Sequence, residues 1–125
     1  IASVSGTMRL SHGANGSEKL VLPRSTVYAF DGGIQTHCVG KARDLNLMLR
    51  KGAAEGELVF VDSGTELNLE PAANETMLLF ELESGNAALC AGGNARLRCT
   101  ANGQCALFTV RLVGEAIPDS DNRNG

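Results

Sequence analysis

Four side chains that could contact a ligand alternate with leucines between Gly40 and Gly52. They are Asp44, Asn46, Met48 and Arg50. In a strand, the period of two residues would place these four side chains on one face and the leucines on the other. Arg50 offers a planar fork suited to a carboxylate, and Asn46 can both donate and accept hydrogen bonds. This face fits either a pocket for a small polar acid or amide, or an edge exposed to solvent.

The charges on this face would need partners if the face were enclosed. Asp44 and Arg50 are six residues apart along one strand face, which is too far for a direct ion pair. Charged groups inside a small barrel are costly unless they are paired and hydrogen-bonded. Inside a barrel, therefore, both charges would need other partners or a bound ligand.

Local propensity leaves residues 40–52 open between helix and strand. Leu and Met favour a helix, and Leu45 and Leu49 would lie one turn apart. The bounding glycines and the strand-like runs on either side favour a strand. Burying each leucine of one face contributes roughly 1.5–3 kcal/mol. We therefore predict a strand here.

The elements that would position this face are short strands between frequent turns. Fifteen glycines supply many of the turn signals, among them Asp31-Gly32-Gly33 and Ala101-Asn102-Gly103. Runs of five to eight residues with period-two character lie between the turns. Four of these runs are predicted strands: 55–62, 65–70, 76–83 and 105–112. The pattern predicts an all-β sandwich or barrel.

Composition limits the class of protein. The 125 residues include 43% hydrophobic and 20% charged residues, with a net charge of −3, which is typical of a globular domain and argues against nucleic-acid binding. The apolar runs are too short to cross a membrane, and the first residues lack the features of a secretory signal. We expect a cytoplasmic protein without a nucleic-acid or membrane partner.

The four cysteines favour the same compartment. They are Cys38, Cys90, Cys99 and Cys105. None belongs to a CxxC pair, and their spacing is not that of a structural zinc site. We expect reduced, partly buried thiols, with a Cys99–Cys105 disulfide as the alternative if those strands pair.

The segment from Val27 to Gly52 carries a resemblance to a known family. It has an aromatic residue, a glycine-containing turn, a short strand, a glycine, and then Asp-x-Asn-x-Met-x-Arg followed by a basic residue. This pattern resembles the HutD/Ves family of small bacterial cupin proteins. The matching positions are Phe30, Gly32, Gly40, Asp44, Asn46, Met48, Arg50 and Lys51. Gly33 departs from the pattern, which has an acid at that position.

The resemblance covers residues 1–113 and implies a cupin, or jelly-roll β-barrel, fold. It implies the later part of a two-barrel (bicupin) protein, incomplete at its N-terminus. Residues 1–33 would be the last strands of a first cupin barrel and residues 34–116 the second barrel. The polar residues 117–125 would form a flexible tail. Edge strands left by a missing barrel half would also allow a homodimer.

The histidines do not suggest a metal centre. Metal-binding cupins usually present an HxH pair, which this chain lacks. His37 and the adjacent Cys38 would point to opposite faces of a strand. We therefore expect no metal or other cofactor. His37 is predicted either to be a half-exposed strand residue or to act as a hydrogen-bond donor or base near Asp44, and His12 is predicted to lie in a loop.

The function that the resemblance implies is non-enzymatic and regulatory, in histidine utilisation. The ligand would be a small polar carboxylate metabolite, such as urocanate or a formyl or formimino derivative of glutamate. Arg50 would take the carboxylate, Asn46 the amide-like end, and Asp44 would orient them. Phe30 and His37 join these residues and Met48 as predicted ligand-binding positions. The alternatives are a cupin enzyme (an isomerase, epimerase or hydrolase) and a purely structural or interaction barrel.

Overall fold

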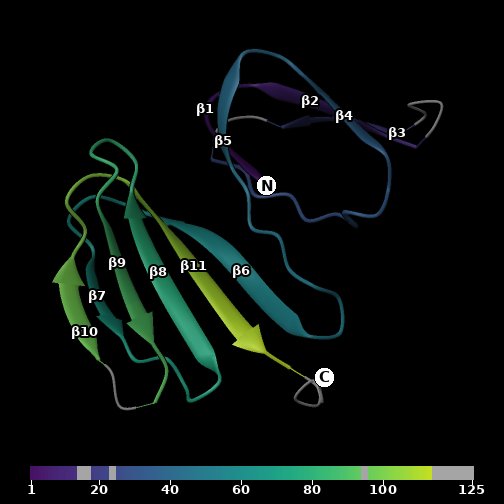
Figure 1. Ribbon diagram of the computed structural model, residues 1–125. Coiled ribbons are helices and arrows are strands. Elements are labelled where there is room, and N and C mark those ends of the chain that lie inside the picture. Colours follow the sequence, from purple (N-terminus) through teal and green to yellow (C-terminus); the bar gives the residue numbers. More distant parts are fainter. Residues whose placement is uncertain (14–17, 23–24, 94–95, 114–125) are drawn as a thin grey trace. The chain divides into compact units, whose positions relative to one another are not determined.

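All regular structure in the described part of the chain is β (Figure 1). The computed structural model describes residues 1–13, 18–22, 25–93 and 96–113. These residues form antiparallel strands and no helix, so the predicted all-β class is confirmed. No helix that could cross a membrane is therefore found in these ranges. The predicted tail, residues 117–125, lies outside them.

The chain divides into two compact units, Ile1–Met48 and Leu49–Gly125. The domain boundary predicted from the sequence lies between residues 33 and 34. The two strands that follow residue 34 pair with the first two strands of the chain, which assigns them to the first unit. Long-range pairing of this kind leaves no mark in local composition. The assignment of the parts to two cupin barrels stays a prediction.

The described residues of the first unit form five strands in two small sheets. They are β1 (Ala2–Gly6), β2 (Met8–His12), β3 (Glu18–Leu22), β4 (Thr36–Val39) and β5 (Ala42–Leu45). One sheet pairs β1 with β5, and the other has the order β3-β2-β4. Because β2 is the central strand of three, both of its edges are hydrogen-bonded.

The core of the first unit lies on one face of β2. Met8 and Leu10 are buried together with Leu22 of β3, and Tyr28 and Ala42 pack against them. Met8 and Leu10 are two residues apart, as the pleat of a strand requires for side chains on one face. The next position on that face is His12.

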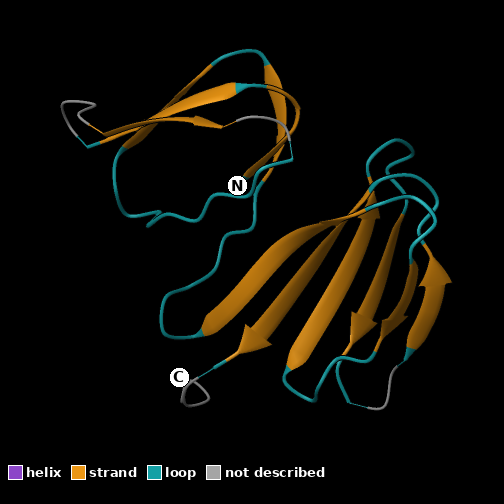
Figure 2. Cartoon of the chain, turned by 180° about the vertical axis from the view of Figure 1, so that it is seen from behind, coloured by secondary structure: helices purple, strands orange, loops and turns teal. Residues whose placement is uncertain are grey.

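Six strands are formed by the residues of the second unit that the structure describes. They are β6 (Ala54–Val61), β7 (Glu66–Leu69), β8 (Glu75–Glu81), β9 (Ala87–Ala91), β10 (Leu97–Thr100) and β11 (Cys105–Leu112). Four form a sheet in the order β6-β11-β8-β9, and β10 pairs with β7 (Figure 2). The four strands predicted from 55–62, 65–70, 76–83 and 105–112 are thereby confirmed as β6, β7, β8 and β11.

Apolar residues from both sheets share the core of the second unit. Its buried members are Val61, Leu69, Leu79, Cys90, Ala101 and Cys105. Leu67 of β7 and Leu97 of β10 pack against them. Leu67 and Leu69, two residues apart on β7, therefore face this core.

All four cysteines are free. The strand that carries Cys99 pairs with β7 and not with β11, so the condition for the alternative disulfide is not met. Burial raises the pKa of the Cys105 thiol, and the negative charge of Glu81 adds to this. Cys105 therefore packs as a protonated, largely apolar side chain.

The predicted strand between Gly40 and Gly52 is confirmed only in its first part. Strand β5 ends at Leu45, and a turn begins where the Arg50 carbonyl accepts the amides of Ala53 and Ala54. The alternation persists beyond the strand. The half-buried residues are Leu45, Leu47 and Leu49, and the exposed ones are Asp44, Asn46, Met48 and Arg50.

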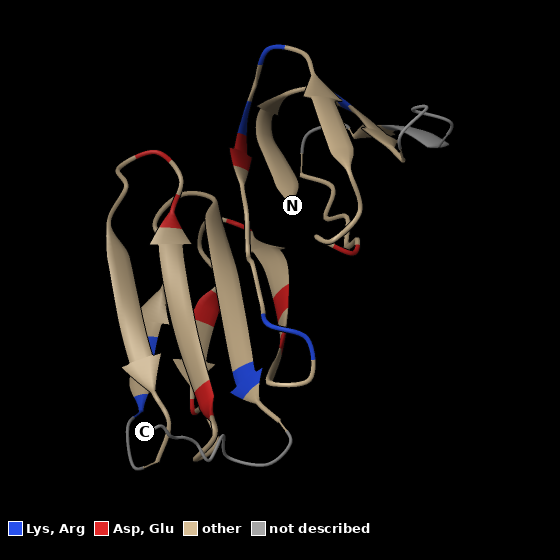
Figure 3. Ribbon diagram, turned by 45° about the vertical axis from the view of Figure 1, so that its right-hand side comes forward, with Lys and Arg blue, Asp and Glu red and all other residues tan. Residues whose placement is uncertain are grey.

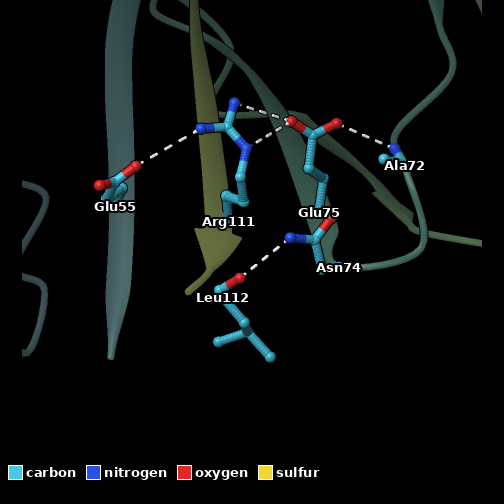
Figure 4. A network of polar contacts seen from close by, with 6 residues as sticks. All are labelled: Glu55, Ala72, Asn74, Glu75, Arg111 and Leu112. Atoms are coloured by element: carbon cyan, nitrogen blue, oxygen red, sulfur yellow. Dashed lines mark hydrogen bonds and ion pairs between the residues drawn. The ribbon is translucent and has the colours of Figure 1, made fainter. Parts of the chain in front are cut away.

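Charged side chains link three neighbouring strands of the second unit. Strands β6 to β11 carry five acidic residues and two arginines (Figure 3). Arg111 of β11 lies opposite Glu55 of β6 and Glu75 of β8 (Figure 4). Its Nε and Nη2 donate to Glu75 Oε2 at 3.1 and 2.9 Å. Its Nη1 lies 3.6 Å from Glu55 Oε2.

Both carboxylate oxygens of Glu75 accept hydrogen bonds. Its other oxygen accepts the Ala72 amide at 2.9 Å, and its side chain is only 15% exposed. The Ala72 amide and the Arg111 guanidinium lower the pKa of Glu75 below its usual 4.5. A lowered pKa means that the ionised carboxylate stabilises the folded state. This stabilisation is complete above the usual pKa and is lost as the pH falls through the lowered one.

We therefore expect Glu75→Gln to unfold more easily than the native protein at neutral pH, and the difference to narrow as the solution is acidified. Urea unfolding at pH 7 and at several pH values below 4.5 measures this. Glu66→Gln, an exposed position on β7, is the matched control and should not change the pH dependence. A constant difference between Glu75→Gln and the native protein would contradict the role of the carboxylate.

Candidate functional site

A buried histidine lies at the end of the core face of the first unit. His12 is the last residue of β2 and is 5% exposed. The prediction that it lies in a loop is wrong. The glycines and asparagine that follow it suggest a turn, but Met8, Leu10 and His12 share one strand face. The period-two pattern of Met-Arg-Leu-Ser-His could have revealed its burial.

Both ring nitrogens of His12 have hydrogen-bonding partners. Nδ1 lies 2.9 Å from Thr36 Oγ1, and Nε2 lies 2.8 Å from the Tyr28 hydroxyl. Thr36 is directly opposite His12 in the β2–β4 register. Tyr28 is held in place by its backbone amide, which donates to the Ile1 carbonyl at 2.8 Å. The site therefore draws on β2, β4 and the loop between β3 and β4.

The geometry assigns a direction to each of these hydrogen bonds. The Thr36 hydroxyl lies 3.0 Å from the Ile34 carbonyl, which can only accept. The single hydroxyl hydrogen is therefore donated to Ile34, and Oγ1 accepts from His12 Nδ1–H. In a neutral imidazole, Nε2 then has a lone pair and accepts from the Tyr28 hydroxyl. The result is a directed relay from Tyr28 through His12 to Thr36.

The Phe30 ring contacts both aromatic members of the relay, His12 and Tyr28. The Tyr28 and Phe30 rings are stacked, with centroids 5.4 Å apart and an interplanar angle of 19°. The His12 and Phe30 centroids are 5.1 Å apart, with tilted planes. Phe30 is 37% exposed, so part of its ring is accessible to a planar ligand. The Tyr28 oxygen, at the end of the relay, supplies a polar group beside that ring.

Phe30 is thus a predicted site residue that the fold brings to a polar cluster. Three others are exposed elsewhere in the first unit. Asp44 lies on β5, and its Oδ2 accepts a hydrogen bond from Asn46 Nδ2 in a long contact of 3.4 Å. Met48 is 84% exposed. These side chains have the types that a polar ligand requires, and their role as ligand contacts stays a prediction.

The remaining two predicted residues are His37 and Arg50. His37 is on β4, as predicted for a strand residue, and is exposed. Its Nε2 makes a long contact of 3.5 Å with Gln35 Nε2. Because Thr36 faces His12, the neighbouring His37 faces away from it. Arg50 is exposed and belongs to the second unit.

The arrangement can bind a ligand through hydrogen bonds. The relay places the His12 ring between two hydroxyl groups, and the Tyr28 oxygen keeps a lone pair that can accept a hydrogen bond from a ligand. No group of three or more metal-ligating side chains that could hold an ion occurs in the described ranges.

Comparison with models of known protein families gives a match to HutD over residues 1–112. The matched range includes all four residues of the aromatic cluster and relay (His12, Tyr28, Phe30 and Thr36) and all six predicted ligand-binding positions. No curated protein and no solved structure matches the chain.

The relay predicts that Tyr28→Phe lowers the free energy of unfolding. This change removes the donor to His12 and leaves a buried Nε2 without a partner. We expect a loss of about 1–3 kcal/mol of unfolding free energy, measured by urea denaturation. In the native protein, long-range proton–nitrogen NMR should find the proton of His12 on Nδ1.

The exposed histidine provides the control. His37→Ala should change the unfolding free energy by less than about 0.5 kcal/mol, since its side chain is exposed. Equal effects of Tyr28→Phe and His37→Ala, or a proton on Nε2 of His12, would contradict the directed relay.

Proposed function

Since the chain belongs to the HutD family, we propose that it binds a small polar carboxylate metabolite and regulates histidine utilisation without catalysing a reaction. Membership in this family links the chain to cupin-like proteins of histidine utilisation. The ligand and the regulatory role are the parts that are proposed. The proposal also includes action in the cytoplasm and no nucleic-acid or membrane partner.

The observation that carries the proposal is the accessible Phe30 ring on the buried relay. A ring that is partly exposed and stacked on Tyr28 offers an apolar surface with a polar edge, which is the usual composition of a small-molecule site. A relay with all its hydrogen bonds made holds Tyr28 in one orientation before a ligand arrives. This preorganisation lowers the entropic cost of binding.

The relay also suggests which ligand chemistry fits. With neutral His12, the Tyr28 oxygen can accept a hydrogen bond from a ligand N–H. With protonated His12, the Tyr28 hydroxyl can donate to a carboxylate. Urocanate combines a planar ring with N–H and carboxylate groups, so it fits both modes and can stack on Phe30.

The other predicted contacts have their own roles in the proposal. Asn46 would take an amide-like end of the ligand, Asp44 would orient Asn46, and Met48 would provide an adaptable apolar contact. Arg50 would take a carboxylate, and His37 would contribute a hydrogen bond. For these five residues the support is side-chain type and exposure.

A second candidate function is a cupin enzyme that isomerises, epimerises or hydrolyses a small polar acid. The relay is also compatible with this alternative, because a histidine between two hydroxyl groups resembles the arrangement that activates general acids and bases. In that case Tyr28 would exchange a proton with the substrate, and the product would accumulate over time.

Calorimetric titration and thermal-shift measurements with urocanate, N-formylglutamate and N-formiminoglutamate test the proposal. At a ligand concentration one hundred times Kd, binding should add about 2.7 kcal/mol to the stability. Phe30→Ala should weaken binding of the ringed ligand by about 0.5–1.5 kcal/mol. Chromatography of the same mixtures shows whether any ligand is converted.

Val21→Ala is the matched control, because Val21 is an exposed apolar residue of the same unit, and it should leave affinity unchanged. Conversion of a ligand that depends on Tyr28 would establish the enzyme instead. If no ligand raises the melting temperature at millimolar concentration, the chain is better described as a structural or interaction barrel.

A further inference from the structure

The second unit contains a polar cavity that the proposed function does not use. Its volume is about 300 Å³. It is lined by Glu55, Gly56, Glu57, Thr109 and Arg111. In the register of β6 and β11, Thr109 lies opposite Glu57 and Arg111 opposite Glu55. Neighbouring antiparallel strands thus present four polar side chains on one face.

Thr109 is the unusual member of this set. It is 7% exposed, and none of the residues that the structure describes hydrogen-bonds its hydroxyl. A buried hydroxyl without a partner is unfavourable, and valine would fill the same volume without this cost. Leu107, two residues earlier on the same face of β11, shows that an apolar residue is accommodated on this face. A hydroxyl in this position is explained by a ligand that completes its hydrogen bonds.

The charges around Thr109 indicate the sign of that ligand. The guanidinium of Arg111 is committed mainly to Glu75, through two hydrogen bonds (Figure 4). Its contact with Glu55 is longer, at 3.6 Å. Glu57 has no ion pair with any of the described residues. The cavity therefore has an excess of negative charge, which attracts a cation and repels a carboxylate that lacks one.

The required ligand must also donate hydrogen bonds. A primary ammonium group carries one positive charge and three N–H donors. Two carboxylates and a hydroxyl oxygen are three acceptors, from Glu55, Glu57 and Thr109. We propose that this cavity binds a small primary ammonium compound, with its nitrogen between the two carboxylates of β6 and the hydroxyl of Thr109.

Either of two kinds of molecule could supply the ammonium group. A diamine offers it without a carboxylate. An α-amino acid offers it with a carboxylate that could reach the N–H groups of Arg111 that do not face Glu75. The shared chemistry is the ammonium nitrogen, and the volume of the cavity suits a small molecule in both cases.

Calorimetric titration of the whole chain with ethylamine, 1,4-diaminobutane and glycine tests the proposal at constant ionic strength. Saturable binding is expected for at least one of them. Tetramethylammonium, a cation without N–H donors, should not bind. Tighter binding of glycine than of ethylamine identifies an amino acid site, and the reverse order identifies an amine site.

Two cavity variants and two controls make the test specific. Glu57→Gln should weaken binding about ten- to a hundredfold, because it removes a charge-assisted hydrogen bond. Thr109→Val should weaken binding and raise the melting temperature of the ligand-free protein, since it removes an unpaired buried hydroxyl. Glu66→Gln on β7 and Tyr28→Phe in the first unit should bind like the native protein.

Tyr28→Phe alters the site in the first unit and leaves this cavity unchanged. The two proposed sites are therefore tested independently of one another. Absence of saturable binding by all three amines would overturn the ammonium site. Equal binding of tetramethylammonium would also overturn it, as would a Thr109→Val protein that binds normally and melts at a lower temperature.

Discussion

Antiparallel pairing with a side-chain period of two residues determines where polar groups can lie in both units. On β2 the inward face runs from Met8 and Leu10 to His12. On β11 the face that supplies the core with Cys105 and Leu107 continues to Thr109 and Arg111. In each case an apolar face becomes polar at one end of the strand. A candidate site therefore begins where the core ends.

The two sites differ in how their buried polar groups are satisfied. His12 has partners at both nitrogens, so its burial is compensated within the protein. The buried hydroxyl of Thr109 has no partner within the described part of the chain. The first arrangement is complete and presents the Phe30 ring and the Tyr28 oxygen to a ligand. The second is incomplete and gains its missing hydrogen bonds from a ligand. This contrast is the physical basis for treating them as separate sites.

The family of the chain and the position of its candidate site are supported by different residues. The HutD match agrees with the resemblance that the alternating residues from Asp44 to Arg50 carry. In the structure these side chains are exposed, and strand β5 ends before Asn46. Of the predicted positions, Phe30 lies beside a buried polar group. The pattern thus identifies the family, while the best-defined cluster of the first unit includes residues that the pattern does not contain.

The sequence by itself determined the all-β class, the limits of the strands near 55–62, 65–70, 76–83 and 105–112, and the alternation along residues 44–50. These depend on turn residues and on a period of two, which are local properties. The tertiary structure decided that His12 meets Tyr28 and Thr36, and that Arg111 lies between Glu55 and Glu75. Such contacts join residues 16 to 56 positions apart, and they follow from strand order and register. Strand order and register depend on the packing of whole sheets, and a single stretch of sequence does not encode them.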